Sequence, residues 1–251
     1  MVHRVFALHL GDKRTRQAQF MYRSATDEPM TVSFYFWVVL GGPEPLVFDV
    51  GFDAGHAAER GVADYRDRAA LLEALDVRAD DIKTVVMSHL HWDHWSGYEL
   101  FPNASFLVQR SEVSFWTDRA PRHDLIMASA NRKALEVLAG LRSKGRIRML
   151  DGETRLWPGI RIVPVGGHTP GLQILVVDAA ERAVILASDA LHFYRNYEER
   201  RPVQVTMDFP DALDAFDTIG KLAEGNILVA GHDPSDCRRF KELAPGVLAV
   251  A

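Results

Sequence analysis

The densest group of metal-binding side chains lies in the stretch MSHLHWDHWSG, at positions 87–97. It contains His89, His91, Asp93 and His94, although the whole chain has only ten histidines and one cysteine. A β-branched run, TVVMS, precedes them, so they stand where a strand ends and a helix is expected to begin. Side chains two apart in an extended segment point to one side, so the first two histidines can converge on one atom. Neutral imidazole and carboxylate are ligands of Zn²⁺, and the stretch therefore predicts a metal site.

Four ligands so close in sequence cannot all surround one tetrahedral ion, so further ligands are expected elsewhere in the chain. Three candidates each follow an apolar run: His168 in VPVGGHTPG, Asp189 in AVILASDAL and His232 in NILVAGHDP. A single polar residue at a strand end is most often satisfied by its surroundings, since leaving it unpaired in a dry site is expensive. Seven such residues, all at strand ends, favour a shared metal centre.

The elements that must position these residues are short apolar strands alternating with helices. The expected strands are 5–10, 31–40, 46–50, 84–88, 105–108, 147–149, 160–165, 172–177, 184–187 and 226–230. The expected helices are 66–75, 111–117, 127–144 and 211–223, the last with Pro210 and an acidic first turn at its start. Two sheets packed together with helices outside would satisfy this order. The stretches 11–30 and 191–210 are expected to be irregular, and long loops of this kind often carry function.

The composition is that of a single globular domain with an acidic charge balance. The 251 residues are 47% hydrophobic and 25% charged, with a net charge of −5, and they contain no linker, so we expect one domain over residues 1–251. The acidic balance argues against nucleic acid as a partner. We also expect no membrane span and no secretory signal, because the apolar runs are too short. Cys237 is the single cysteine, which gives no disulfide framework, and a cytoplasmic location is expected.

The motifs HLHWDH, GGHTPG, SDA and AGHD, in this order, resemble the pattern of the metallo-β-lactamase-fold hydrolases. Asp49 in FDVG also resembles the Asp-x-Gly that those enzymes carry near the site. The resemblance implies an α/β fold, the αββα sandwich, with two mixed β-sheets face to face, helices outside and the active site in a shallow cleft at one edge. The motifs span residues 49–232, most of the chain.

The same resemblance implies how the ligands are shared between two divalent metal ions. One ion would be held by His89, His91 and His168, the second by Asp93, His94 and His232, and Asp189 would bridge both. Zn²⁺ is the expected metal, while the sequence leaves Mn, Fe and Co open.

Within this broad family the chain most resembles the N-acyl homoserine lactonases, the quorum-quenching group. Zinc β-lactamases lack a bridging aspartate, and glyoxalase II-like thioesterases add a helical domain, whereas only a short segment follows His232 here. The resemblance implies that a metal-bridging hydroxide attacks the carbonyl of a small lactone. The alternatives left open are a cyclic amide or imide, an aryl ester, and a mononuclear-iron or thioester-cleaving member of the fold. The sequence also leaves the oligomeric state open, a homodimer included.

The chain departs from the lactonases at His192, where they commonly carry a tyrosine three residues after the bridging aspartate. Asp93 and His192 are the candidates for returning a proton to the substrate, although His192 could equally be a packed histidine or a further metal neighbour. Aromatic side chains near the ligands are candidates for the wall of a substrate pocket. These candidate substrate-binding residues are Trp92, Trp95, Phe193 and Tyr194.

Overall fold

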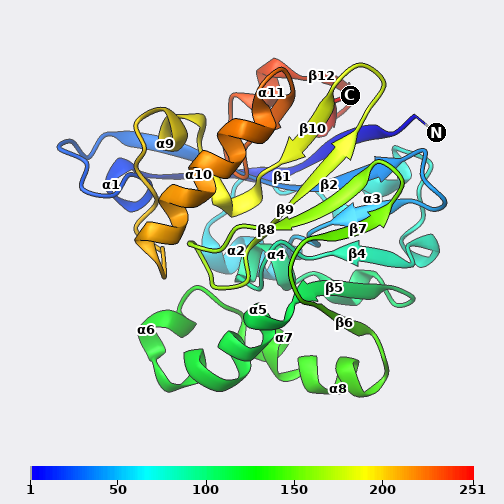
Figure 1. Cartoon of the computed structure of the whole chain (residues 1–251), viewed down its shortest axis with the longest axis horizontal. Coiled ribbons are helices and arrows are strands. Elements are labelled where there is room, and N and C mark those ends of the chain that lie inside the picture. Colours follow the sequence, from blue (N-terminus) through cyan, green and yellow to red (C-terminus); the bar gives the residue numbers. More distant parts are fainter. Residues whose placement is uncertain (1) are drawn as a thin grey trace.

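Two β-sheets form the centre of the molecule, with helices on their outer faces (Figure 1). The computed structural model describes residues 2–251. The larger sheet has eight strands in the order β12-β13-β1-β2-β3-β4-β5-β6, antiparallel from β12 to β3 and parallel from β3 to β6. Its strands are β1 Arg4–Arg16, β2 Pro29–Leu40, β3 Leu46–Phe48, β4 Thr84–Val86, β5 Ser105–Gln109, β6 Ile147–Leu150, β12 Lys241–Ala244 and β13 Val247–Ala249.

The smaller sheet has five strands in the order β11-β10-β9-β8-β7, of which only β10 and β11 run parallel. Its strands are β7 Thr154–Trp157, β8 Ile160–Pro164, β9 Gln173–Asp178, β10 Ala183–Leu186 and β11 Ile227–Val229. Both sheets are therefore mixed, and the predicted αββα sandwich is confirmed.

Most of the helices are short. They are α1 Gln17–Phe20, α2 Ala54–Arg60, α3 Arg68–Glu73, α4 Trp92–Trp95, α5 Arg110–Ser114, α6 Asp124–Met127, α7 Arg132–Glu136, α8 Leu138–Ser143, α9 Tyr194–Glu198, α10 Phe209–Ala223 and α11 Asp236–Arg239. The exception, α10, lies alongside β10 of the smaller sheet in Figure 1 and buries Phe216 and Ile219 against that sheet. Its first turn is capped by Asp208, whose carboxylate accepts from the Asp211 N–H at 3.1 Å.

The apolar run of β2 shows how one strand serves two cores. Tyr35, Trp37 and Val39 pack between the two sheets, while Phe34 and Phe36 face the helices on the other side. Because successive side chains of a strand point to opposite faces, a strand covered on both faces must be apolar throughout. The continuous run FYFWVVL follows from this double burial.

Several elements differ from those expected. The stretch predicted as irregular after residue 10 continues β1 as far as Arg16, because β2 supplies a partner strand over its whole length. The single helix expected over 127–144 is divided into α7 and α8, preceded by α6, and the Asn131 side chain caps α7. Strands β7, β12 and β13 were not predicted. No helix within residues 2–251 is long and apolar enough to cross a membrane.

Candidate metal centre

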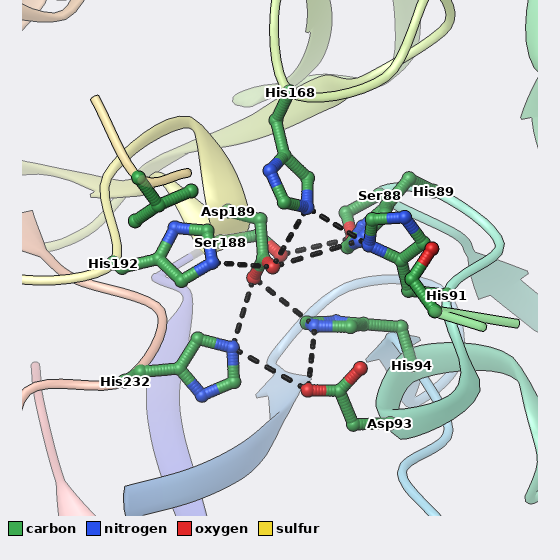
Figure 2. A network of polar contacts seen from close by, with 12 residues as sticks. Ser88, His89, His91, Asp93, His94, His168, Ser188, Asp189, His192 and His232 are labelled. Carbon is green, nitrogen blue, oxygen red and sulfur yellow. Dashed lines mark hydrogen bonds and ion pairs between the residues drawn. The ribbon is translucent and has the colours of Figure 1, made fainter. Parts of the chain in front are cut away.

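Seven polar side chains converge where β4, β8, β10 and β11 end, and they come from the segments that follow strands of both sheets (Figure 2). Figure 2 shows the Asp189 carboxylate in the middle, with imidazole rings around it. All seven predicted ligands lie within the groups of side chains that could hold a metal ion: His89, His91, His168 and Asp189 in one, and Asp93, His94 and His232 in another. A third such group contains His192 with Asp189 and His232.

The first group brings three ring nitrogens to one point. The Nδ1 atom of His91 lies 2.9 Å from His89 Nε2 and 2.8 Å from His168 Nε2. Asp189 Oδ2 lies 3.2 Å from His168 Nε2 and 3.6 Å from His89 Nε2. Three imidazoles and one carboxylate oxygen therefore face a common centre.

The second group faces the other oxygen of the same carboxylate. Asp189 Oδ1 lies 3.0 Å from His94 Nε2 and 3.0 Å from His232 Nε2. Asp93 Oδ2 lies 3.7 Å from His94 Nε2 and 3.6 Å from His232 Nε2. With one oxygen towards each group, Asp189 has the arrangement of a carboxylate that bridges two sites.

Hydrogen bonds behind the ligands fix which ring nitrogen faces the centre. His94 Nδ1 lies 2.7 Å from Asp49 Oδ2 and His232 Nδ1 lies 2.9 Å from the Ser33 carbonyl, and each acceptor requires a proton on that nitrogen. Ser88 Oγ donates to Asp49, so it accepts from His89 Nδ1 at 2.9 Å. In the neutral form, each of these three rings therefore turns the lone pair of Nε2 towards the centre, as a histidine that binds a metal does.

The protonation of the imidazoles follows from burial and from nearby charge. Burial lowers the pKa of His89 and of His91 well below the usual range, and the neighbouring imidazoles add to this effect. Burial also lowers the pKa of His192, to about 4, against the opposing effect of Asp189. At His94, burial is outweighed by the surrounding carboxylates, which raise its pKa well above the usual range. Carboxylate charge at the centre thus favours a cation there.

The side chains fit divalent metal ions. An imidazole nitrogen carries either one proton or one lone pair, so three nitrogens directed at one point cannot all satisfy one another. His94 Nε2 is buried, and its 3.0 Å approach to Asp189 Oδ1 lacks hydrogen-bond geometry, so this nitrogen has no hydrogen-bond partner within residues 2–251. A cation at each group accepts these lone pairs, and neutral imidazole with carboxylate is the donor set that Zn²⁺ and related ions take. The centre is therefore a site for divalent metal ions.

A cleft with a volume of about 160 Å³ opens onto this centre. Its floor includes Asp93, Asp189 and His192, and its walls include aromatic side chains from three segments of the chain. These aromatic residues are Phe20, Phe34 and Trp92. The cleft can therefore place an apolar ring beside the ligand cluster.

Only one of the four aromatic residues predicted for the pocket wall lines this cleft. That residue is Trp92, which packs against Phe34 and Phe52. Trp95, at the end of the same short helix, is 1% exposed, and its indole N–H donates to the Ala134 carbonyl at 2.8 Å. Its side chain belongs to the core beneath the cleft, because the turn of α4 directs it towards α7.

The other two predicted wall residues also lie away from the cleft. Phe193 is buried behind Phe20, with their rings edge to face at 5.5 Å. The Tyr194 hydroxyl donates to Asp236 Oδ1 at 2.7 Å, on the side of α11. Phe193 and Tyr194 are close to His192 in sequence but do not line the cleft, because α9 begins at Tyr194 and turns the chain away from it.

Glu112 is a buried carboxylate that is not among the predicted site residues. It accepts from the backbone N–H of Leu90 at 3.0 Å, from that of Gly171 at 2.9 Å and from the Trp116 indole N–H at 2.7 Å. The first two N–H groups belong to the loops that carry His91 and His168. Burial raises the pKa of Glu112, although these donors oppose the effect. Glu112 lies four residues before Trp116, and residues four apart share one face of a helix, so the sequence spacing alone indicates that these two side chains are neighbours.

The sequence matches the model of the metallo-beta-lactamase superfamily over residues 31–232. This range contains all seven ligands described above. The chain belongs to the metallo-beta-lactamase superfamily.

Curated relatives within this superfamily are lactonases. An N-acyl homoserine lactonase of Bacillus thuringiensis, AiiA, is 27% identical over 179 residues, which cover 68% of this chain and 65% of the relative. The AttM lactonase of Azorhizobium caulinodans is 30% identical over 184 residues, covering 70% of this chain and 67% of the relative. The match to AiiA thus spans just under two thirds of that protein's length.

Solved structures agree with this fold over nearly the whole chain. An N-acyl homoserine lactone hydrolase with the product N-hexanoyl-L-homoserine bound at its catalytic metal center has a TM-score of 0.81 at 18% identity, covering 99% of this chain and 100% of that one. AidC, described as a dizinc quorum-quenching lactonase, has a TM-score of 0.77 at 17% identity, covering 99% and 94%. At such identities the structures establish a shared fold.

Proposed function

We propose that this enzyme hydrolyses small cyclic esters, N-acyl homoserine lactones or other lactones, with two Zn²⁺ ions held by its seven ligands. The observation that carries the proposal is Asp189, whose two carboxylate oxygens face two separate ligand groups at the base of an aromatic-lined cleft. The curated lactonase relatives support the lactone as substrate. When bound, such ions lower the pKa of water and polarise a carbonyl oxygen.

The residues of the chain position the substrate for this reaction. Phe34 and Trp92 form an apolar wall against which the ring or a short substituent can lie. The net reaction adds water across the ester: oxygen bonds to the carbonyl carbon, the ring C–O bond breaks, and the products are a hydroxyl and a carboxylate. The departing ring oxygen must gain a proton.

Two side chains in the cleft can serve that oxygen. The first is His192, whose Nε2 lies 3.0 Å from Asp189 Oδ2 and whose ring lines the cleft, so its N–H can donate to the departing oxygen instead. The second is Asp93, whose Oδ2 faces the second ligand group while its carboxylate lines the same cleft. We propose that His192 supplies the hydrogen bond that the lactonase tyrosine commonly gives, and that Asp93 carries the transferred proton.

The test is hydrolysis measured by pH-stat with the zinc-loaded enzyme on a lactone, a cyclic amide and an aryl ester. We expect turnover of the lactone, a loss of at least about a hundredfold in kcat for Asp93→Asn with its circular dichroism unchanged, and partial retention of activity in His192→Tyr. Turnover of the cyclic amide or aryl ester alone would contradict the lactone proposal. One metal equivalent per chain in the fully active enzyme would contradict the dinuclear site.

A further inference from the structure

The cleft contains one cationic side chain, Lys13, that the hydrolysis described above does not use. It lies on β1, opposite Val32 of β2, and it lines the cleft together with Val32 and Phe34. Because side chains alternate along a strand, Lys13 and Thr15 face the cleft while Arg14 is exposed to solvent. A lysine thus stands on the face of the strand that is turned towards the aromatic walls.

Within residues 2–251, Lys13 forms neither an ion pair nor a side-chain hydrogen bond. The neighbouring carboxylate of Asp12 points to the other face of β1, where it accepts from Ser33 Oγ at 2.6 Å. The carboxylates that line the cleft are Asp93 and Asp189, and both face the metal-binding imidazoles. No described acidic group therefore neutralises the Lys13 ammonium.

A second donor stands beside it. The Thr15 hydroxyl donates to Gln19 Oε1 at 2.8 Å, which leaves the amide N–H₂ of Gln19 without an acceptor among the described residues, and both side chains line the cleft. An ammonium and an amide N–H₂ at one wall are both donors, and donors of this kind bind an anionic oxygen pair.

The size of the cleft limits what can reach this wall from the metal centre. Its volume of about 160 Å³ is close to that of a protein cavity of about 150 Å³ that accommodates benzene, although the cleft is also open to solvent. A single ring with one short substituent fits, with the ring against Trp92 and Phe34.

We propose that the preferred substrate is a compact, single-ring cyclic ester carrying a carboxylate, and that Lys13 binds this carboxylate while the ester lies at the metal centre. This inference rests on the proposed lactone hydrolysis and adds the charge and size of the substrate. Lys13 would then act on specificity, through substrate binding.

The test compares paraconic acid, a single-ring γ-lactone that carries a carboxylate, with its carboxamide, which has the same ring and nearly the same shape without the charge. A charge-assisted hydrogen bond contributes about 1.5–3 kcal/mol, equivalent to roughly 10- to 150-fold. We expect the zinc-loaded enzyme to favour the carboxylate by at least about tenfold in kcat/KM. In Lys13→Met this ratio should fall by about tenfold or more, mainly through KM, and Lys13→Arg should restore part of it.

Arg14→Met is the matched control, because it removes the same charge from the solvent face of the same strand and should leave the ratio within about twofold. A wild-type ratio near one, or an unchanged ratio in Lys13→Met, would overturn the role of Lys13. If no lactone is hydrolysed, the proposed function fails on its own. In that case calorimetry can measure the affinity of the two compounds for the zinc-loaded wild type and for Lys13→Met. The ratio of the two affinities, carboxylate over carboxamide, should then be at least about tenfold in the wild type and should fall in Lys13→Met.

Discussion

Asp49 accepts four hydrogen bonds directly beneath the ligand cluster. They come from His94 Nδ1 at 2.7 Å, from the Ser88 N–H and hydroxyl at 2.6 and 2.7 Å, and from the Ser188 hydroxyl at 3.1 Å. Its backbone has a φ of 61°, in the left-handed region that aspartate and asparagine tolerate better than most residues. A buried carboxylate with donors on both oxygens therefore sets the orientation of two neighbouring segments of the metal centre.

We expect Asp49→Asn to weaken metal binding by about 10- to 100-fold, the usual effect of losing an acceptor behind a ligating histidine. In either orientation the amide N–H₂ would face a donor, the Ser88 N–H or His94 Nδ1, so at least one hydrogen bond that orients the ligands would be lost. Zinc affinity measured by competition with a chromophoric chelator checks this. Asp53→Asn is the matched control, because Asp53 also pairs with a histidine, His56, but on the surface. An equal loss of affinity in both variants would contradict the role given to Asp49.

At the scale of the elements, the loop after β8 is fitted closely against α10. Gly167 has a φ of +84°, and a Cβ there would lie 2.5 Å from the Ala212 Cα and 2.6 Å from its backbone nitrogen. The Gly167 carbonyl accepts from the N–H groups of Met207 and Asp208, at the start of the same helix. The helix and the loop that carries His168 are therefore held in one arrangement.

Gly167→Ala should reduce the free energy of unfolding by about 2–4 kcal/mol, because it adds a contact with backbone to the left-handed conformation. It should also reduce zinc affinity, since His168 is the next residue. Gly145→Ala is the control that separates the left-handed conformation from the contact with backbone. Gly145 has a φ of +71° but no atom within 4 Å of a Cβ, so its substitution is expected to cost only about 1 kcal/mol of unfolding free energy. Urea unfolding of both zinc-loaded variants measures these free energies. Equal losses in Gly167→Ala and Gly145→Ala would show that the close fit of Gly167 against α10 does not matter.

Sequence patterns predicted best those elements whose apolar residues end abruptly at polar residues or glycine. Strands such as β2 and β10 are apolar runs ended by glycine or aspartate, and α10 has a proline and acidic residues in its first turn. The second half of β1, DKRTR, has polar residues on both faces, so no alternation of hydrophobicity distinguishes it from a loop. Its extended form depends on pairing with β2, which lies far enough away in sequence to be invisible to a local pattern.

The metal ligands could be predicted because seven side chains of the right chemistry stand at strand ends, in motifs that resemble those of a known family. The cleft walls could not, because they depend on packing between distant segments. Trp92 and Trp95 are both beside ligands in sequence, yet one lines the cleft and the other fills the core. Phe20 reaches the cleft from the end of α1 and Phe34 from β2, and nothing in their local sequence indicates this position.

At the scale of the whole molecule, the metal centre joins the two sheets. His89 and His94 follow β4 of the larger sheet, whereas His168, Asp189 and His232 follow strands of the smaller one. Their contacts cross from one sheet to the other, as in the 3.0 Å approach of His94 Nε2 to Asp189 Oδ1. Ions at this point are therefore expected to hold the two layers together as well as to support the reaction.

Removal of the metal should consequently lower the thermal stability of the whole enzyme. Free metal at about a thousand times its dissociation constant adds about 4 kcal/mol to stability, which for a protein of 150–250 residues corresponds to a Tm change on the order of 10 °C. Differential scanning calorimetry with and without a chelator measures the change.

His168→Ala should unfold at a lower temperature and respond less to the chelator, because one ligand group has lost an imidazole. His123→Ala, which removes an exposed histidine outside the centre, should keep the full response. An unchanged wild-type Tm after elemental analysis has confirmed metal removal would mean that the ions serve the reaction without joining the two sheets.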